Sequence, residues 1–281
     1  MLEYIGIDET YLPKLTKSTD IAGYYNGVPV ISGALDQIAG TIGTGVTDEK
    51  RISTMTGTIM AICAMTDKIP EFREDSIIPC HTHAIDGKYC MLLWSSTAGM
   101  ALKWFKNNLA ENLSFKELDE LAEKVSPGCD GVTMLPYFSG STMPKYNPEA
   151  RAVFAGLNLS HGKGHMARSI MEAVAYILKQ DIEYIGNDRI EEIRITGGGA
   201  SSPLWSQIDA DVTQKILHTV SESETACLGS AIIAAVGIGA FKSIEEAANG
   251  IVSVKKEYRP SGADYTDGYN RFCALDGLMN I

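Results

Sequence analysis

Three short segments of this sequence carry groups suited to phosphoryl transfer. The first is Asp36-Gln37, a carboxylate and an amide that follow a predicted strand ending in glycine. The second is Thr56-Gly57-Thr58, in which a glycine between two threonines can turn sharply and offer amides and hydroxyls to phosphate oxygens. The third is the glycine-rich segment 196–202, whose missing side chains would let a base or ribose lie against the backbone. We expect a side chain at Gly199 to occupy the place of the base.

Each segment also has an ordinary structural interpretation. Asp36 can cap a helix, Gly57 can simply form a hairpin, and the glycine triplet can be a close-packed turn. Gly99 opens a further predicted helix, whose start either binds an anion or is only a capping turn. A dehydrogenase is disfavoured, because position 202 is serine where the dinucleotide fingerprint needs glycine, and no acidic residue follows at the required distance.

The elements that must position these segments follow from hydrophobic patterning. Mixed strands come first, and strands alternating with helices follow, which predicts a three-layer α/β domain whose mixed sheet is flanked by helices. We predict strands at 28–33, 132–138, 192–195 and 216–220, hairpins within 51–64 and 77–93, and helices at 36–43, 95–108, 114–125, 163–185, 202–213 and 224–236.

Composition and charge narrow the function classes. The 281 residues have a net charge of −11, which argues against a nucleic-acid partner or an anionic membrane surface. No apolar run approaches the roughly 20 residues of a membrane span, and the N-terminus lacks the features of a signal peptide, so we expect a cytoplasmic protein. The six cysteines lack CxxC spacing, and His81 and His83 lack nearby partners, so we predict no metal site made by protein side chains.

The order and surroundings of these segments resemble the C-terminal half of the FGGY carbohydrate kinases, most closely the xylulokinases. Residues 152–157 with 165–172 fit the C-terminal signature of that family, and residues 224–231 are similar to its closing helix. The resemblance extends over residues 3–260. It implies the ribonuclease-H-like fold that these kinases share with the actin and hexokinase ATPases.

The resemblance also implies roles for individual residues. Asp36 would be the catalytic base that takes a proton from a sugar hydroxyl, and Gln37 would bind the same substrate. Gly57 and Thr58 would contact the terminal phosphates of ATP, and Gly99 would contact the nucleotide. Gly199 and Ala200 would contact the adenosine. The implied ligands are ATP, Mg²⁺ and a sugar, with xylulose or a related ketose or polyol expected.

The resemblance divides the chain and predicts a partner. We interpret residues 1–24 as an interdomain lead-in from a missing N-terminal sugar-binding domain, and 25–281 as the C-terminal nucleotide-binding domain. The isolated chain is then expected to be inactive, and its exposed apolar surface would favour a homo-oligomer. A non-catalytic nucleotide-binding or regulatory module of the same fold is the alternative.

Overall fold

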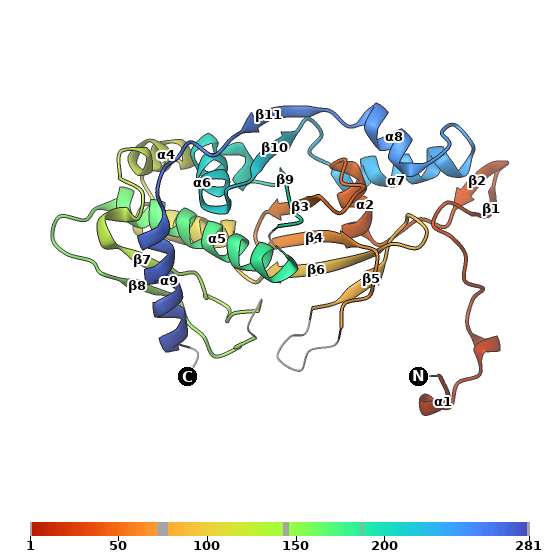
Figure 1. Cartoon of the computed structure of the whole chain (residues 1–281), viewed down its shortest axis with the longest axis horizontal. Helices are drawn as coiled ribbons and strands as arrows, with labels where there is room; N and C mark the ends of the chain where they lie inside the picture. The colour runs from red at the N-terminus through yellow and green to blue at the C-terminus, as the bar shows by residue number, and fades with distance from the viewer. Residues whose placement is uncertain (1, 72–77, 143–145, 187, 280–281) are drawn as a thin grey trace.

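One seven-stranded mixed sheet organises the fold, shown by a computed structural model that describes residues 2–71, 78–142, 146–186 and 188–279 (Figure 1). The strand order is β11-β10-β9-β3-β4-β6-β5. β9 pairs in parallel with both β3 and β10, and the other neighbours are antiparallel. The strands are β3 (Arg51–Thr56), β4 (Met60–Thr66), β5 (Cys80–Thr82), β6 (Tyr89–Ser95), β9 (Glu192–Thr196), β10 (Ile216–Val220) and β11 (Val254–Tyr258).

Helices cover both faces of this sheet. Successive residues of a strand point to opposite faces, and in β4 Ile62 belongs to the core that includes α5 and α6, whereas Cys63 belongs to the core that includes α2, α7 and α8. No helix in the described ranges is both long and apolar enough to cross a membrane. The helices are α2 (Asp36–Gly43), α3 (Gly99–Leu109), α4 (Phe115–Glu123), α5 (Lys163–Ile185), α6 (Pro203–Thr213), α7 (Thr225–Gly237), α8 (Ile244–Ile251) and α9 (Thr266–Met279).

Most predicted elements are confirmed, and α2, α5 and β10 have the predicted bounds. The helix predicted at 95–108 begins at Gly99 instead, because Ser95 is still the last residue of β6 and pairs with Met60. β5 and β6 form the predicted hairpin, although residue 77 lies outside the described residues. Hydrophobic patterning did not identify α8, β11 and α9. It also did not predict that β7 (Thr133–Leu135) pairs with β8 (Val153–Ala155).

Helices α2 and α7 touch through their backbones. A Cβ atom on Gly43 would overlap the carbonyl oxygen of Thr225, and a Cβ atom on Gly229 would overlap that of Ala39. Only glycine permits such an approach, since any side chain would force the helices apart. The helix that begins with Asp36 is therefore held directly against α7.

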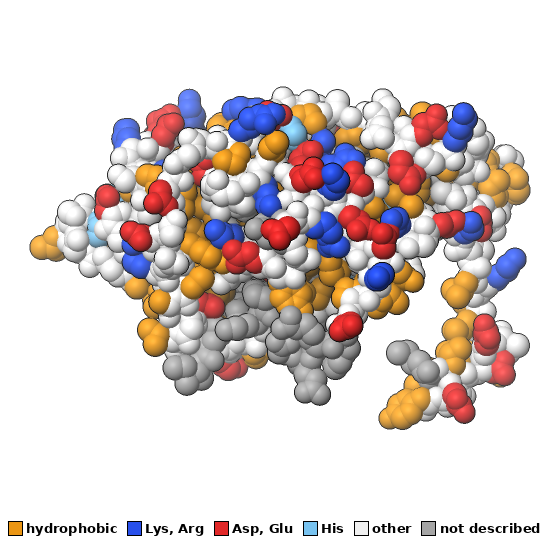
Figure 2. All heavy atoms as spheres, viewed as in Figure 1, with side chains coloured by type: hydrophobic (Ala, Val, Ile, Leu, Met, Phe, Trp, Pro, Cys, Tyr) orange, Lys and Arg blue, Asp and Glu red, His pale blue; other side chains and the backbone are white. Residues whose placement is uncertain are grey.

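The N-terminal residues form an arm that extends away from the sheet (Figure 1). It contains α1 (Leu2–Ile5) and leads into a hairpin of β1 (Ile21–Tyr25) with β2 (Val28–Ile31). Tyr4, Tyr11 and Leu15 are 93, 82 and 92% exposed, and hydrophobic side chains are visible along the arm in Figure 2. The predicted boundary between residues 24 and 25 falls inside β1, and the division into domains stays a prediction.

Candidate active site

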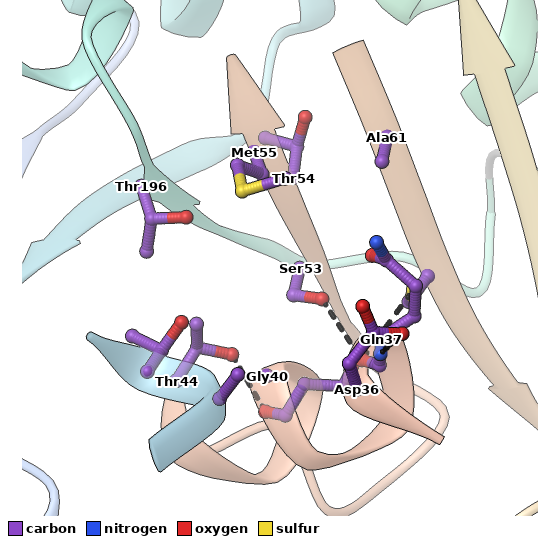
Figure 3. Close-up of a pocket in the computed structure, with 13 residues that line it drawn as sticks. Asp36, Gln37, Gly40, Thr44, Ser53, Thr54, Met55, Ala61 and Thr196 are labelled. Atoms are coloured by element: carbon purple, nitrogen blue, oxygen red, sulfur yellow. Dashed lines mark hydrogen bonds between the residues drawn. The ribbon is translucent and has the colours of Figure 1, made fainter. Parts of the chain in front are cut away.

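Asp36 is the first residue of α2, and its side chain is exposed beside β3 (Figure 3). The N-cap residue is Leu35, so the capping interpretation of Asp36 holds only in part: its Oδ1 accepts a hydrogen bond from Gln37 N at 2.8 Å. The dipole of α2 favours negative charge at this position. Asp36 is thus an exposed carboxylate at the start of α2.

A recess of about 160 Å³ adjoins Asp36 and Gln37. Thr41 Oγ1 donates to the backbone oxygen of Gln37 at 2.8 Å and lies 3.0 Å from Ser53 Oγ, which joins the first turn of α2 to β3 (Figure 3). The recess is smaller than the roughly 300 Å³ at which ligand pockets usually begin. It is a local feature beside Asp36 and is too small for a nucleotide. Further hydroxyl side chains on its wall are Thr44, Thr196 and Thr225.

A larger cavity of about 740 Å³ brings together most of the predicted nucleotide contacts. Gly57 and Thr58 come from the β3–β4 turn, Gly99 from the start of α3, and Gly199 from the loop after β9. Ala200 does not line this cavity among the described contacts, and it lines a neighbouring one of about 350 Å³. Three segments far apart in the sequence therefore meet at one cavity of nucleotide size.

The β3–β4 turn is hydrogen-bonded to the start of α3. The amides of Ala98 and Met100 donate to Thr58 O at 3.1 and 3.2 Å, and that of Gly99 donates to Gly57 O at 2.9 Å. A Cβ atom on Gly99 would overlap Gly57 O. These three amides are consequently occupied by protein, and Gly99 has a packing reason to be glycine. Thr58 is exposed and lines the cavity, so its hydroxyl can face a phosphate.

The three glycines after β9 differ in what surrounds them. Gly197 has φ +87°, and a Cβ atom there would lie 2.7 Å from Thr56 O. A Cβ atom on Gly199 would lie 2.7 Å from Thr56 Cγ2, so a side chain at 199 would first collide with Thr56. That such a side chain would occupy the place of the base stays a prediction. Gly198 lines the cavity and has no atom within 4 Å of its Cβ position. Gly198 is the glycine of the triplet that faces open space.

Sequence reasoning missed the wall that α4 contributes. The helix starts with a capping box in which Ser114 Oγ accepts from Glu117 N at 3.2 Å and Glu117 Oε2 accepts from Ser114 N at 2.7 Å. Helical spacing then buries Leu118 and Ala122 in the core. Phe115, Lys116 and Asp119 of the same helix line the cavity, opposite Met100 and Lys103 of α3 and Pro203 and Trp205 of α6.

Asp119 is the half-buried residue of this wall. Burial raises the pKa of its carboxyl above the ordinary value, the hydroxyl of Ser202 acts in the opposite direction, and the charge of Glu123 adds to the rise. The capping box was recognisable in the sequence as a helix start. Nothing in the local pattern indicated that Asp119 would face a cavity, because the other cavity-lining segments are distant in the sequence.

Comparison with known proteins agrees with this arrangement. A family model for the C-terminal domain of the FGGY family of carbohydrate kinases matches residues 56–238. The xylulose kinase of Staphylococcus epidermidis is 28% identical over 276 residues, covering 97% of this chain and 54% of that protein. The glycerol kinase of Thermococcus gammatolerans is 28% identical over 269 residues, covering 92% and 54%. The crystal structure of ligand-bound xylulose kinase from Lactobacillus acidophilus matches with a TM-score of 0.91 at 22% identity, covering 99% of this chain and 60% of that one.

The structural match confirms the ribonuclease-H-like fold of the actin and hexokinase type. The chain spans about half the length of the curated relatives it matches. The family model covers well over half of the residues, including the β3–β4 turn, the start of α3 and the glycine loop. This chain belongs to the FGGY family of carbohydrate kinases.

Proposed function

We propose that this chain provides the nucleotide-binding half and the catalytic base of an ATP-dependent sugar kinase. The observation that carries the proposal is the meeting of Gly57–Thr58, Gly99 and Gly198–Gly199 at one cavity, next to the recess at Asp36. Strand β3 connects the two, because Met55 lines the recess and Thr56 lines the cavity. A triphosphate whose terminal phosphate lies at the β3–β4 turn would point toward Asp36.

Asp36 acts on the acceptor in this proposal. A sugar hydroxyl oxygen forms a bond to the γ-phosphorus, the bond from that phosphorus to the β–γ bridging oxygen breaks, and ADP leaves. The hydroxyl proton passes to a carboxylate oxygen of Asp36. Phosphoryl transfer has a loose transition state that needs an oriented acceptor more than a strong base, so an exposed aspartate suffices. Gln37 lines the same recess and would hold a neighbouring sugar hydroxyl.

Charge at the cavity favours a polyanion despite the net charge of −11. Lys103 and Lys116 lie on its wall, both exposed, against one carboxylate from the described residues, Asp119. In the described ranges no group of three His, Cys, Asp or Glu side chains could hold a metal ion. A Mg²⁺ that enters with ATP would be held mainly by phosphate oxygens and water. When bound, Mg²⁺ would neutralise phosphate charge.

An N-terminal domain would provide the other wall of the cleft and most of the sugar pocket. This proposal is supported by the coverage of about half of each relative and by the exposed apolar side chains of the N-terminal arm. Those same side chains would favour self-association when uncovered. Xylulose, another ketose or a polyol is the proposed acceptor, and a cytoplasmic location goes with such substrates.

Two measurements test the proposal. Isothermal titration of the purified chain should give saturable ATP binding, and the absence of binding would contradict a nucleotide site. The chain joined to its N-terminal domain should release ADP from ATP and Mg²⁺ only when a sugar is present, with xylulose, glycerol and gluconate as the first panel. ATP binding without turnover on any polyol or sugar would assign the protein to the non-catalytic alternative.

A further inference from the structure

We propose that Asp119 selects the nucleotide base by accepting a hydrogen bond from the exocyclic amino group at purine C6. The site would then take adenine in preference to hypoxanthine or guanine. This inference rests on the proposed function, since it requires that the cavity holds a nucleoside triphosphate. It adds a specificity residue on α4, outside the glycine and threonine segments described above.

The course of the glycine loop indicates that Asp119 lies at the end of the cavity away from the β3–β4 turn. Gly199 lies against Thr56, immediately before that turn. Ser202 follows three residues later, lines the same cavity as Asp119, and lies near enough for its hydroxyl to lower the pKa of the Asp119 carboxyl. The loop therefore runs from the β3–β4 turn toward α4. A nucleotide with its phosphates at Gly57–Thr58 has its ribose near the middle of this loop and its base at α4.

The charge of Asp119 supports the same orientation. Asp119 is the one carboxylate among the described residues that line the cavity. Close to the phosphates it would repel the ligand, because two negative charges at short range near a protein surface are unfavourable. Unlike Asp36, Asp119 has no proton to accept from the acceptor hydroxyl, so its charge is better accommodated at the uncharged end of the ligand. The base is the uncharged end.

The surroundings of Asp119 leave it able to accept a further hydrogen bond. The carboxyl is half-buried, and burial raises its pKa because water has been removed, while the nearby Ser202 hydroxyl lowers it. Its neighbours on the cavity wall include the apolar Phe115 and Trp205. A donor from the ligand would replace the lost water. Adenine presents the N6 amino group as such a donor. Hypoxanthine and guanine present the O6 acceptor at the same position, and their N1–H could pair with the carboxylate only if the base shifted along the cavity wall.

Inosine triphosphate isolates this interaction, because its base differs from adenine in carrying oxygen in place of the amino group at C6. Wild-type protein should bind ATP about 10–100-fold more tightly than ITP in isothermal titration, the ratio expected from one unpaired half-buried acceptor. In Asp119→Asn the ratio should fall to near unity, because the new amide can donate to O6. Glu123→Gln is the matched control: it removes an exposed charge one turn along α4, outside the cavity lining, and should keep the wild-type ratio.

The outcomes separate this inference from the proposed function. Equal ATP and ITP affinities in the wild type would overturn the role of Asp119 while leaving the nucleotide site in place, and this comparison needs no variant. Strong discrimination against 2′-deoxy-ATP that disappears in Asp119→Asn would also overturn it, since the carboxylate would then bind the ribose. Failure of the wild type to bind any of the three nucleotides would refute the proposed function itself.

Discussion

Valine substitutions at two adjacent glycines should affect different properties: Gly198→Val should lower the nucleotide affinity, and Gly199→Val should lower the stability. Gly198 has φ −62° and ψ −36°, which any L-residue adopts, and its Cβ position meets no atom within 4 Å. Gly198→Val should therefore keep the free energy of unfolding within about 1 kcal/mol of wild type. Its side chain would project into open space beside the cavity. Displacement of the ribose from this loop should lower ATP affinity by about 10–100-fold, corresponding to about 1–3 kcal/mol.

Gly199→Val serves as the contrast, because its Cβ atom would lie 2.7 Å from Thr56 Cγ2 and 2.9 Å from Thr56 Cβ. Overpacking of this kind costs about 1–3 kcal/mol of unfolding free energy. Urea denaturation gives the stability of each variant, and isothermal titration with ATP gives the affinity. Wild-type ATP affinity in a folded Gly198→Val protein would refute the assignment of this loop as the nucleotide wall. Wild-type stability in Gly199→Val would refute the described contact with Thr56.

Three further predictions concern the base and two buried acids. In the enzyme joined to its N-terminal domain, Asp36→Asn should keep ATP affinity and lower turnover about 10²–10⁴-fold; near-normal turnover would remove Asp36 from the mechanism. Glu172 is buried and accepts hydrogen bonds from Arg168 Nε at 2.8 Å, from Gly128 N and from Tyr176 Oη. Glu172→Gln should therefore lower the free energy of unfolding, measured in urea, by about 3–5 kcal/mol. A decrease of less than about 1 kcal/mol would contradict the pairing with Arg168. Burial raises the pKa of Asp181 to about 8, so the folded state holds a proton that the unfolded state releases, and stability should fall as pH rises from about 4 to 8. Asp181→Asn should make the free energy of unfolding less dependent on pH and should stabilise the protein at pH 7. The same pH dependence in the variant as in the wild type would contradict the titration of Asp181.

The architecture was predictable because the strongest signals are local and periodic. The stripe of α5 and the capping box of α4 identify these helices without any tertiary information. The C-terminal elements α8, β11 and α9 were not identified. β11 is an edge strand whose first four residues are exposed, so it lacks the apolar alternation that marks a half-buried strand.

The site was predictable only where a short motif carries the chemistry. Gly57, Thr58, Gly99 and Gly199 share one cavity as expected, yet which glycine of the triplet faces open space depends on Thr56, a residue far away in the sequence. Asp119 was not recognisable in the sequence, because an aspartate on an amphipathic helix is normally solvated. Its partial burial involves residues distant in the sequence, among them Ser202. Side chains that gain a role from a distant neighbour are not readable from local patterns.

The interlocked glycines of α2 and α7 have a mechanical consequence. Where Gly43 meets Thr225 and Gly229 meets Ala39, no atoms separate the two backbones, so neither helix can slide past the other without collision. Packed interfaces of this kind move as units and do not deform gradually. Any movement of Asp36 with its helix α2 therefore requires α7 to move as well. In a kinase that closes around its substrates, this carboxylate would keep its place within this half, and the acceptor hydroxyl would have to be brought to it by the opposing wall.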